Sequence, residues 1–247
     1  MKEWFEDESF WSDLYCFMFN EARFEQADME ADDIIQLLPF QGASMLDLGC
    51  GPGRFTLAFS RRGYRMTGVD KSEFLLGKAM EKSLAAGLTI EWIHDDMREF
   101  RRPGTFDLIL NLFSSFGYFR DKNDDMIVLK NMYDNLKPGG KVLFELMSKE
   151  CMARIYQETI SEELEDGSLL IHRHKITEDW TRIENEWIHI KDGSAKTFRP
   201  ILTLYSAQEL KDRLGRTGFR EMTVYGGWDG RPYNEKAQRM VVIAKKQ

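Results

Sequence analysis

Carboxylates lie in or directly after three largely apolar runs in the first half of the chain. Asp47 lies inside the run 43–48, Asp70 ends the run 65–70, and the pair Asp95-Asp96 follows the run 88–94. A carboxylate accepts hydrogen bonds from hydroxyl, amine and ammonium groups and from backbone N–H groups. In an open α/β sheet the ligand lies beyond the carboxyl ends of the strands, so we expect a ligand site at that edge of the sheet.

Three glycines follow Asp47 at alternate positions and give the pattern Asp-x-Gly-x-Gly-x-Gly. This pattern predicts a tight turn from a buried strand into a helix at 54–62, because glycine tolerates positive φ and lets the backbone approach a ligand closely. A dinucleotide enzyme would instead have Gly-x-Gly-x-x-Gly, whereas here the third glycine comes one residue early and Arg54 follows it. An acid two residues before the first glycine suits an ammonium group or loop N–H groups better than a pyrophosphate.

Strand-like and helix-like segments alternate from residue 43 onward. Such alternation predicts right-handed βαβ units and a parallel sheet. The turn Lys137-Pro138-Gly139-Gly140 is expected to precede the fifth strand. The expected strands are 43–48, 65–70, 88–94, 106–110 and 141–147, and the expected helices are 54–62, 72–86 and 122–136.

The alternation stops between residues 148 and 205. After a helix at 149–157 come long runs typical of an antiparallel meander. A further helix and two strands then complete the sheet. The expected strands of the meander are 168–177, 180–191 and 195–205 with a turn at 192–194, and the later elements are a helix at 207–217 and strands at 219–225 and 239–245.

The predicted fold class is therefore α/β. We expect a Rossmann-like, mostly parallel seven-stranded sheet with helices on both faces, plus an antiparallel β insertion after the fifth strand. The sheet domain comprises 41–147 and 206–247, and the insertion comprises 148–205. The carboxyl end of the fifth strand leads into the insertion, so we expect the insertion to form a lid or wall of the ligand site.

Residues 1–40 are rich in aromatic and acidic side chains. The aromatic residues recur at roughly helical spacing, which predicts one or two short helices whose aromatic face packs on the core. Part of that face could instead border a ligand. The pattern continues as a helix over 25–38, and Pro39 is expected to end it. We therefore expect an N-terminal helical segment that borders the site.

The composition is that of a globular protein with an acidic surface. The 247 residues carry a formal net charge of −7, which disfavours nucleic acid as a partner. The three cysteines, Cys16, Cys50 and Cys151, form neither a CxxC pair nor an even framework, which favours a cytoplasmic location. The N-terminus lacks a secretory pattern, and no apolar run reaches about 18 residues, so no membrane partner is expected.

These residues resemble the class I S-adenosylmethionine-dependent methyltransferases through most of the sheet domain. The glycine pattern is similar to that family's first motif, whose backbone lies under the amino acid part of the cofactor. Asp70 matches the acid that holds both ribose hydroxyls by charge-assisted bonds. Asp96 and the Met97 N–H match the adenine-binding segment. The resemblance implies S-adenosyl-L-methionine as cofactor, S-adenosyl-L-homocysteine as product, and a set of cofactor-binding residues: Asp47, Gly49, Cys50, Gly51, Gly53, Asp70, Lys71, Asp96, Met97 and Asn111, together with Arg23 and Tyr15.

Two looser matches favour the small-molecule branch of that family. Arg23 resembles the arginine that grips the methionine carboxylate in glycine and sugar-amine N-methyltransferases. The segment 111–118 departs from the Asp/Asn-Pro-Pro-Tyr pattern of adenine or glutamine N-methylation, and the Pro-Cys nucleophile of cytosine methylation is absent from the sequence. We therefore expect methyl transfer to a nitrogen or oxygen of a small molecule, by in-line displacement with little covalent or acid/base help.

Substrate and catalytic residues are predicted from position alone. Phe113, Tyr118 and Trp228 are expected to contact the substrate. Tyr118, His172 and His174 are candidates for a general base. The two histidines lie on one face of a strand, but no third ligand is spaced to join them, so no metal is expected.

Other functions stay open at this point. The insertion could dock a protein or RNA substrate, form a homodimer interface, or simply extend the sheet. The chain could also be a noncatalytic cofactor-binding module. A nicotinamide dehydrogenase is disfavoured by Asp47 and by Arg54 after the third glycine.

Overall fold

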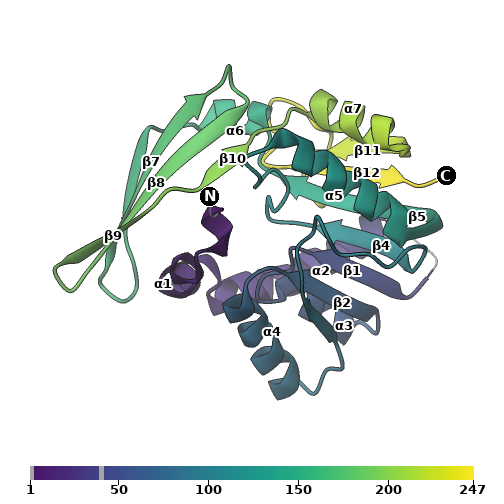
Figure 1. The fold of residues 1–247 in the computed structure, drawn as a ribbon, viewed down its shortest axis with the longest axis horizontal. Coiled ribbons are helices and arrows are strands. Elements are labelled where there is room, and N and C mark those ends of the chain that lie inside the picture. The colour runs from purple at the N-terminus through teal and green to yellow at the C-terminus, as the bar shows by residue number, and fades with distance from the viewer. Residues whose placement is uncertain (1–2, 39–41) are drawn as a thin grey trace.

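The computed structural model describes residues 3–38 and 42–247, which form two sheets with helices around them (Figure 1). The larger sheet has seven strands in the order β11-β12-β5-β4-β1-β2-β3, and the smaller sheet has five strands. The helices are η1 (Trp4–Glu6), α1 (Glu8–Met18), α2 (Glu21–Leu37), α3 (Arg54–Arg61), α4 (Glu73–Ala85), α5 (Lys122–Asn135), α6 (Lys149–Ile155) and α7 (Ala207–Thr217). The strands are β1 (Ser44–Leu48), β2 (Arg65–Asp70), β3 (Glu91–His94), β4 (Phe106–Asn111), β5 (Leu136–Leu146), β6 (Thr159–Glu163), β7 (Leu169–Thr177), β8 (Arg182–Lys191), β9 (Ser194–Phe198), β10 (Ile201–Thr203), β11 (Arg220–Tyr225) and β12 (Met240–Lys245).

The larger sheet is parallel except for β12, which runs antiparallel to β5 and β11. Both of its faces are apolar, because successive residues of a strand point to opposite sides. Met45 of β1 shares a buried cluster with Ala31 of α2 and Phe59 of α3. Its neighbour Leu46 shares the other cluster with Leu129 of α5. Helices cover both faces, and the predicted fold class is confirmed (Figure 1).

The topological switch point lies at β1. This strand pairs in parallel with β2 on one side and with β4 on the other. The chain therefore leaves neighbouring strands in opposite directions, and a crevice forms above their carboxyl ends. Asp47 and Asp70 lie at this edge on β1 and β2.

The N-terminal segment lies between the insertion sheet and the larger sheet (Figure 1). The ring of Phe10 on α1 is 5.5 Å from the ring of Trp187 on β8 and 5.4 Å from that of Phe198 on β9. The Lys196 Nζ of β9 lies 2.6 Å from a carboxylate oxygen of Asp13 on α1. The insertion therefore supports the N-terminal segment directly. Within the described residues, no helix is both long and apolar enough to cross a membrane.

Two details of the predicted meander are wrong. The expected strand 195–205 is divided into β9 and β10, because Pro200 between them has no N–H for a sheet hydrogen bond. The strand β6 (Thr159–Glu163) was not predicted. All of its side chains are exposed on an edge of the smaller sheet, so no apolar alternation marks it in the sequence.

Two boundaries in the sheet domain also differ. The third strand starts at Glu91 rather than at 88, since Leu88 closes the end of α4 by a backbone bond from its N–H to Ser83 O. The predicted turn at 137–140 belongs to β5, which starts at Leu136 and changes register against β4. The expected helix end at Pro39 lies outside the described residues.

Candidate active site

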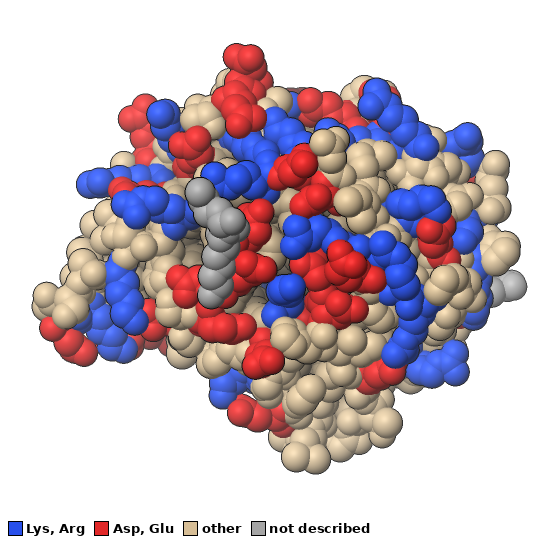
Figure 2. All heavy atoms as spheres, viewed as in Figure 1, with Lys and Arg blue, Asp and Glu red and all other residues tan. Residues whose placement is uncertain are grey.

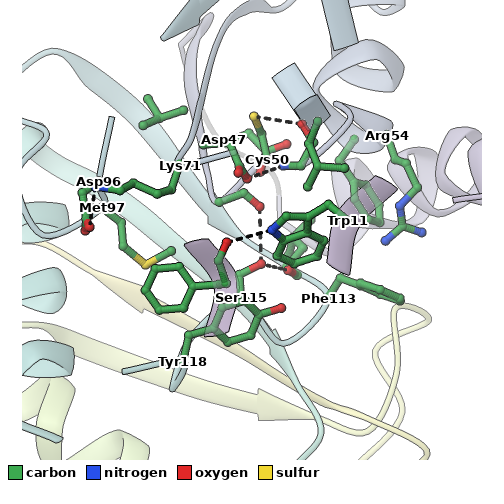
Figure 3. Close-up of a pocket in the computed structure, with 18 of the residues that line it drawn as sticks. Trp11, Asp47, Cys50, Arg54, Lys71, Asp96, Met97, Phe113, Ser115 and Tyr118 are labelled. Carbon is green, nitrogen blue, oxygen red and sulfur yellow. Dashed lines mark hydrogen bonds and ion pairs between the residues drawn. The ribbon is translucent and has the colours of Figure 1, made fainter. Parts of the chain in front are cut away.

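A cavity lies at the switch point, and its empty space, including the open solvent at its mouth, is about 860 Å³ (Figure 3). The glycine loop and four acids line one part of it, and aromatic side chains of the N-terminal segment line another. Of its described lining residues, none belongs to 148–205, so the insertion is not a direct wall. The lining residues are Phe5, Trp11, Met18, Phe19, Asp47, Gly49, Cys50, Gly51, Arg54, Phe55, Val69, Asp70, Lys71, Leu75, Asp95, Asp96, Met97, Leu112, Phe113, Ser115, Tyr118 and Phe119.

The glycine loop between β1 and α3 needs its glycines for two different reasons. Gly51 has φ +55°, and a Cβ there would meet its nearest atoms at 3.9 Å, so its backbone stays open to a ligand. Gly53 has φ +80°, and a Cβ there would lie 2.5 Å from the Trp92 ring of β3. The first glycine therefore leaves room in the cavity, and the second lets the loop pack against the sheet.

Asp70 joins two loops at the floor of the cavity. Its Oδ2 accepts a hydrogen bond of 2.7 Å from the Gly51 N–H, and its Oδ1 accepts one of 2.9 Å from the Ser72 N–H. The Ser72 hydroxyl in turn donates to Glu8 of α1 at 2.7 Å, which ties the N-terminal segment to this edge. Burial raises the pKa of Asp70 despite these bonds. Each carboxylate oxygen has a further lone pair for a ligand hydroxyl.

Asp96 lies at another end of the cavity and pairs with Arg98. Two guanidinium nitrogens of Arg98 donate to the two carboxylate oxygens at 3.0 and 2.7 Å. Burial would raise the pKa of Asp96, but the Arg98 hydrogen bonds outweigh it and the pKa is lowered. Asp96 is therefore ionised, and Lys71 adds a second cation 3.5 Å away. The predicted acceptor for adenine is present, although Arg98 already occupies part of its capacity.

Asp47 is a buried acid inside the glycine loop. It accepts a hydrogen bond from the Thr56 hydroxyl of α3 and still lines the cavity. Burial raises its pKa to about 6. Its charge is therefore costly without a cation, and an ammonium group in the cavity would stabilise it.

Some predicted cofactor residues lie outside the cavity lining. Gly53 supports the loop from behind, as described above. Asn111 is fully buried and donates from Nδ2 to Leu48 O at 2.7 Å, which ties β4 to β1. Tyr15 packs against Phe19, and its hydroxyl is buried with no hydrogen-bond partner among residues 3–38 and 42–247. Arg23 lies 5.6 Å from the centre of the Phe113 ring, next to the cavity.

The predicted substrate and base residues are also dispersed. Phe113 and Tyr118 line the cavity, whereas Trp228 is buried next to Phe55 and is not among the described lining residues. His172 lies between Trp187 and Phe17, and burial lowers its pKa. His174 borders a second cavity, beneath the insertion. Neither histidine is among the described lining residues of the first cavity.

Tyr118 does not have the properties of a general base. Burial raises the pKa of its hydroxyl well above the ordinary value. The phenol is therefore protonated at neutral pH and can only donate or accept a hydrogen bond as a neutral group. No group of three or more His, Cys, Asp or Glu side chains able to hold a metal ion was found in the described part of the chain.

Sequence reasoning missed several lining residues. The single hydroxyl proton of Ser115 can be donated to Leu112 O at 2.9 Å or to Gly49 O at 3.3 Å, so the side chain lies between the segment after β4 and the glycine loop. Trp11 covers the cavity from α1, and its indole N–H donates to Phe5 O at 2.8 Å. The aromatic stripe of residues 1–40 was the available signal, but it did not show which rings face the ligand site.

Comparison with known proteins is consistent with this site. The sequence model of the methyltransferase domain family matches residues 45–140, from β1 into β5. A protein of Geobacillus sp. (strain WCH70) that is named as a methyltransferase by inference is 25% identical over 98% of this chain and 99% of its own length. The dTDP-3-amino-3,4,6-trideoxy-alpha-D-glucopyranose N,N-dimethyltransferase of Streptomyces venezuelae is 29% identical over 54% of this chain and 56% of its own.

A solved structure gives the same answer for the fold. The S-adenosylmethionine-dependent methyltransferase of Clostridium acetobutylicum ATCC 824 superposes with a TM-score of 0.78 at 16% identity, over 96% of each chain. The family match covers the glycine loop, Asp70 and Asp96. Residues 45–140 thus form a methyltransferase domain, and the chain has the fold of the S-adenosylmethionine-dependent methyltransferases.

Proposed function

We propose that this enzyme transfers the methyl group of S-adenosyl-L-methionine to a nitrogen or oxygen of a small molecule and releases S-adenosyl-L-homocysteine. One observation carries the proposal: the glycine loop, Asp70 and Asp96 line a single cavity that aromatic side chains of the N-terminal segment cover. A cavity covered by aromatic side chains suits a small acceptor better than a polymer. The name of the Streptomyces venezuelae relative, an amino-sugar dimethyltransferase, supports the same class of acceptor.

The residues of the cavity fit this cofactor. Asp70 has lone pairs for two ribose hydroxyls, Asp96 and the Met97 backbone lie together for an adenine edge, and Asp47 offers a carboxylate to an ammonium group. The bound sulfonium supplies an electrophilic methyl group. The protein then has to hold the acceptor in line and exclude water.

An amine that arrives uncharged is the acceptor that this cavity serves best. Tyr118 is protonated, and His172 and His174 lie outside the described lining, so none of the predicted bases supports proton removal from an alcohol. A neutral amine is already nucleophilic and needs only alignment. We therefore favour nitrogen over oxygen as the methyl acceptor.

The insertion is proposed to act on the site through the N-terminal segment. Its strands β8 and β9 hold α1 by aromatic contacts and by the ion pair of Lys196 with Asp13. In this role it is an outer support of the cavity cover. The three cysteines are free, which supports a cytoplasmic setting.

Isothermal titration calorimetry tests the cofactor part of the proposal. Wild-type protein should bind S-adenosyl-L-methionine, and Asp70→Ala should weaken binding by roughly 10- to 100-fold, because hydrogen bonds to a charged group are lost. Asp134→Ala is the control, since Asp134 pairs only with the exposed Lys130 on α5 among described residues. No heat of binding in the wild type would refute the proposal.

The acceptor class needs a separate measurement. On the face seen in Figure 2, Lys and Arg side chains are interspersed with Asp and Glu, which does not favour docking of RNA. Mass spectrometry of reactions with small amines, a peptide and an RNA should show a 14 Da gain only on amines. Methylation of the peptide or the RNA alone would move the enzyme to the polymer-modifying class. Tight binding of product with no methylation of any acceptor would make it a noncatalytic module.

A further inference from the structure

A second cavity lies beneath the insertion and is lined mainly by apolar side chains. Its empty space, including the open solvent at its mouth, is about 600 Å³. Ile183, Asn185 and Trp187 alternate along β8 and therefore point to one side of the smaller sheet, and all three line this cavity. Leu146 lines it from the end of β5, and Met152 lines it from α6. The cavity thus lies between the insertion and the sheet domain.

The segment after β4 separates this cavity from the one at the switch point. Phe113 and Ser115 line the first cavity, whereas Ser114 and Phe116 line the second. No described residue lines both. The Ser114 Oγ accepts a hydrogen bond of 2.9 Å from the Met147 N–H, which fixes the segment to the end of β5. The two cavities are therefore neighbours with a common wall.

Two buried polar groups of the second cavity have no hydrogen-bond partner among the described residues. One is the indole N–H of Trp187, and the other is the hydroxyl of Thr203, a residue that is only 6% exposed. A buried donor that lacks an acceptor is costly, so such a group in a native protein calls for an explanation. The Trp187 N–H can only donate, so any partner for it in the cavity has to be an acceptor.

The other polar groups of the lining are already engaged. Asn185 donates from Nδ2 to Pro200 O at 3.1 Å, and the Tyr205 hydroxyl donates to the carboxylate of Asp125. The Nδ1 of His174 lies 2.9 Å from a backbone carbonyl oxygen. The described lining includes no Asp, Glu, Lys or Arg that could balance a charge on a ligand. The lining therefore suits an uncharged molecule.

We propose that the second cavity is a ligand site of its own, for an uncharged and mainly apolar molecule that carries a carbonyl oxygen. The apolar part packs among Phe116, Met152 and Ile183. The oxygen accepts a hydrogen bond from the Trp187 indole, and the Thr203 hydroxyl is a second donor at this site. The site goes beyond the proposed function, because it holds neither the cofactor nor the methyl acceptor.

Ligand-observed NMR titration with acetophenone and ethylbenzene tests the two donors. The probes are similar in shape, but only acetophenone has a carbonyl oxygen. Trp187→Phe/Thr203→Val removes both donors and largely keeps the apolar surface, so the affinity for acetophenone relative to ethylbenzene should fall roughly 3- to 10-fold from that of the wild type. An unchanged ratio would overturn the proposal.

The matched control is Trp180→Phe/Thr197→Val. Both residues belong to the insertion, and both are exposed and lie outside the described lining of the cavity. The control should keep the wild-type ratio of the two affinities. A fall equal to that of Trp187→Phe/Thr203→Val would show a general effect on the insertion, and so would count against the proposed site.

A second variant is needed because Trp187 also packs against α1 and its replacement could disturb folding. Met152→Trp fills part of the cavity from its partly exposed position on α6, and it should weaken binding of both probes. Binding as tight as in the wild type would contradict the site. A crystal soaked with acetophenone should show its ring in this cavity, whereas ordered water alone at Trp187 and Thr203 would overturn the proposal.

Two measurements test whether the site is separate from methyl transfer. Saturation with S-adenosyl-L-homocysteine should change the affinity for acetophenone less than about twofold, whereas displacement would place the probe in the first cavity. Any methylation of 4-aminoacetophenone should be equal in the wild type and in Trp187→Phe/Thr203→Val. Methylation that only the wild type carries out would make this cavity the acceptor site and overturn the proposal. If the wild type binds no cofactor, the proposed function fails, while acetophenone and ethylbenzene still test the second cavity.

Discussion

At the scale of single residues, the site depends on acids whose environments differ. Asp96 has a lowered pKa because Arg98 holds it, whereas burial raises the pKa of Asp47 to about 6. Asp96 is thus charged before any ligand arrives. Asp47 gains its full stabilisation only when a cation enters the cavity.

This difference predicts a pH dependence of cofactor binding. Below pH 6 the free protein protonates Asp47, and the neutral acid no longer attracts an ammonium group, so affinity should fall as pH falls. With a pKa of about 6, lowering the pH from 7 to 5 should weaken binding of S-adenosyl-L-methionine by about tenfold. Calorimetry at both values checks this, with Asp47→Asn expected to show a lower affinity that changes less with pH than that of the wild type. Equal affinities for the wild type at both pH values would contradict the role of Asp47.

Asp70 and Asp96 could be predicted from the sequence because each lies at or after the end of a predicted strand and matches an acidic position of the family that the chain resembles. Arg54 could not be recognised as a site residue. An arginine after a glycine loop is ordinary in sequence, and its meaning lies in its burial beside Phe113 and the lack of a partner among described acids. The sequence also could not show that His172 and His174 lie outside the cavity lining. Their position depends on the packing of α1, whose Phe17 lies against His172.

At the scale of elements, the loop from β1 to α3 sets the shape of the cavity floor. Gly53→Ala should lower the free energy of unfolding by roughly 2–5 kcal/mol, since strain at positive φ adds to overlap with Trp92. Gly63→Ala is the matched control. Gly63 has φ +86° but has no atom within 4 Å of an added Cβ, so only about 1–2 kcal/mol of strain is expected. Urea unfolding of both variants tests this prediction. Equal losses in the free energy of unfolding would show that the close packing of Gly53 against Trp92 does not contribute to stability.

The insertion and α1 form the second unit at this scale. Phe10→Leu removes aromatic contacts with Trp187 and Phe198 and should cost about 1–2 kcal/mol of stability. It should also weaken cofactor binding, because α1 covers the cavity. Phe219→Leu is the control: Phe219 is as deeply buried but packs on Tyr133, away from the cavity lining. Urea unfolding and calorimetry on both variants test this. Equal cofactor affinities of Phe10→Leu and Phe219→Leu would show that the contact of the insertion with α1 does not affect cofactor binding.

Helices and strands could be predicted where apolar residues form a clear pattern in the sequence. Strands buried on both faces, such as β1 and β4, are rich in apolar residues in the sequence. The exposed β6 carries no such period, and the break at Pro200 depends on a missing N–H within an otherwise regular run. The contact of the insertion with α1 joins residues more than 170 positions apart (Phe10 and Trp187), which periodicity cannot show.

At the scale of the whole molecule, a second buried acid links α5 to the end of the insertion. Asp125 is fully buried and accepts a hydrogen bond from the Tyr205 hydroxyl. Burial raises its pKa to about 6, while the Tyr205 bond and the charges of Arg213 and Arg182 oppose that rise. The folded protein therefore holds a proton at Asp125 that the unfolded chain, with its lower pKa, releases.

Stability should consequently fall as pH rises from about 4 through 6. In that window the folded state binds more protons than the unfolded state, and a shift from 3.8 to about 6 corresponds to at most about 3 kcal/mol. Asp125→Asn keeps an acceptor for Tyr205 and should remove this part of the slope, so its stability relative to wild type should increase between pH 4 and 7. Asp47 contributes a similar slope to both proteins. The free energies of unfolding of the two proteins are measured in urea at several pH values. A constant difference between them from pH 4 to 7 would show that Asp125 does not titrate as described.

The central claim of this account is that the cavity at the switch point binds S-adenosyl-L-methionine in one orientation. A crystal structure with S-adenosyl-L-homocysteine measures it most directly. The account predicts adenine at Asp96 and Met97, ribose hydroxyls on Asp70, and the amino acid end extending past Gly51 toward Arg54. Density for the ligand in the reverse orientation, or outside this cavity, would contradict it.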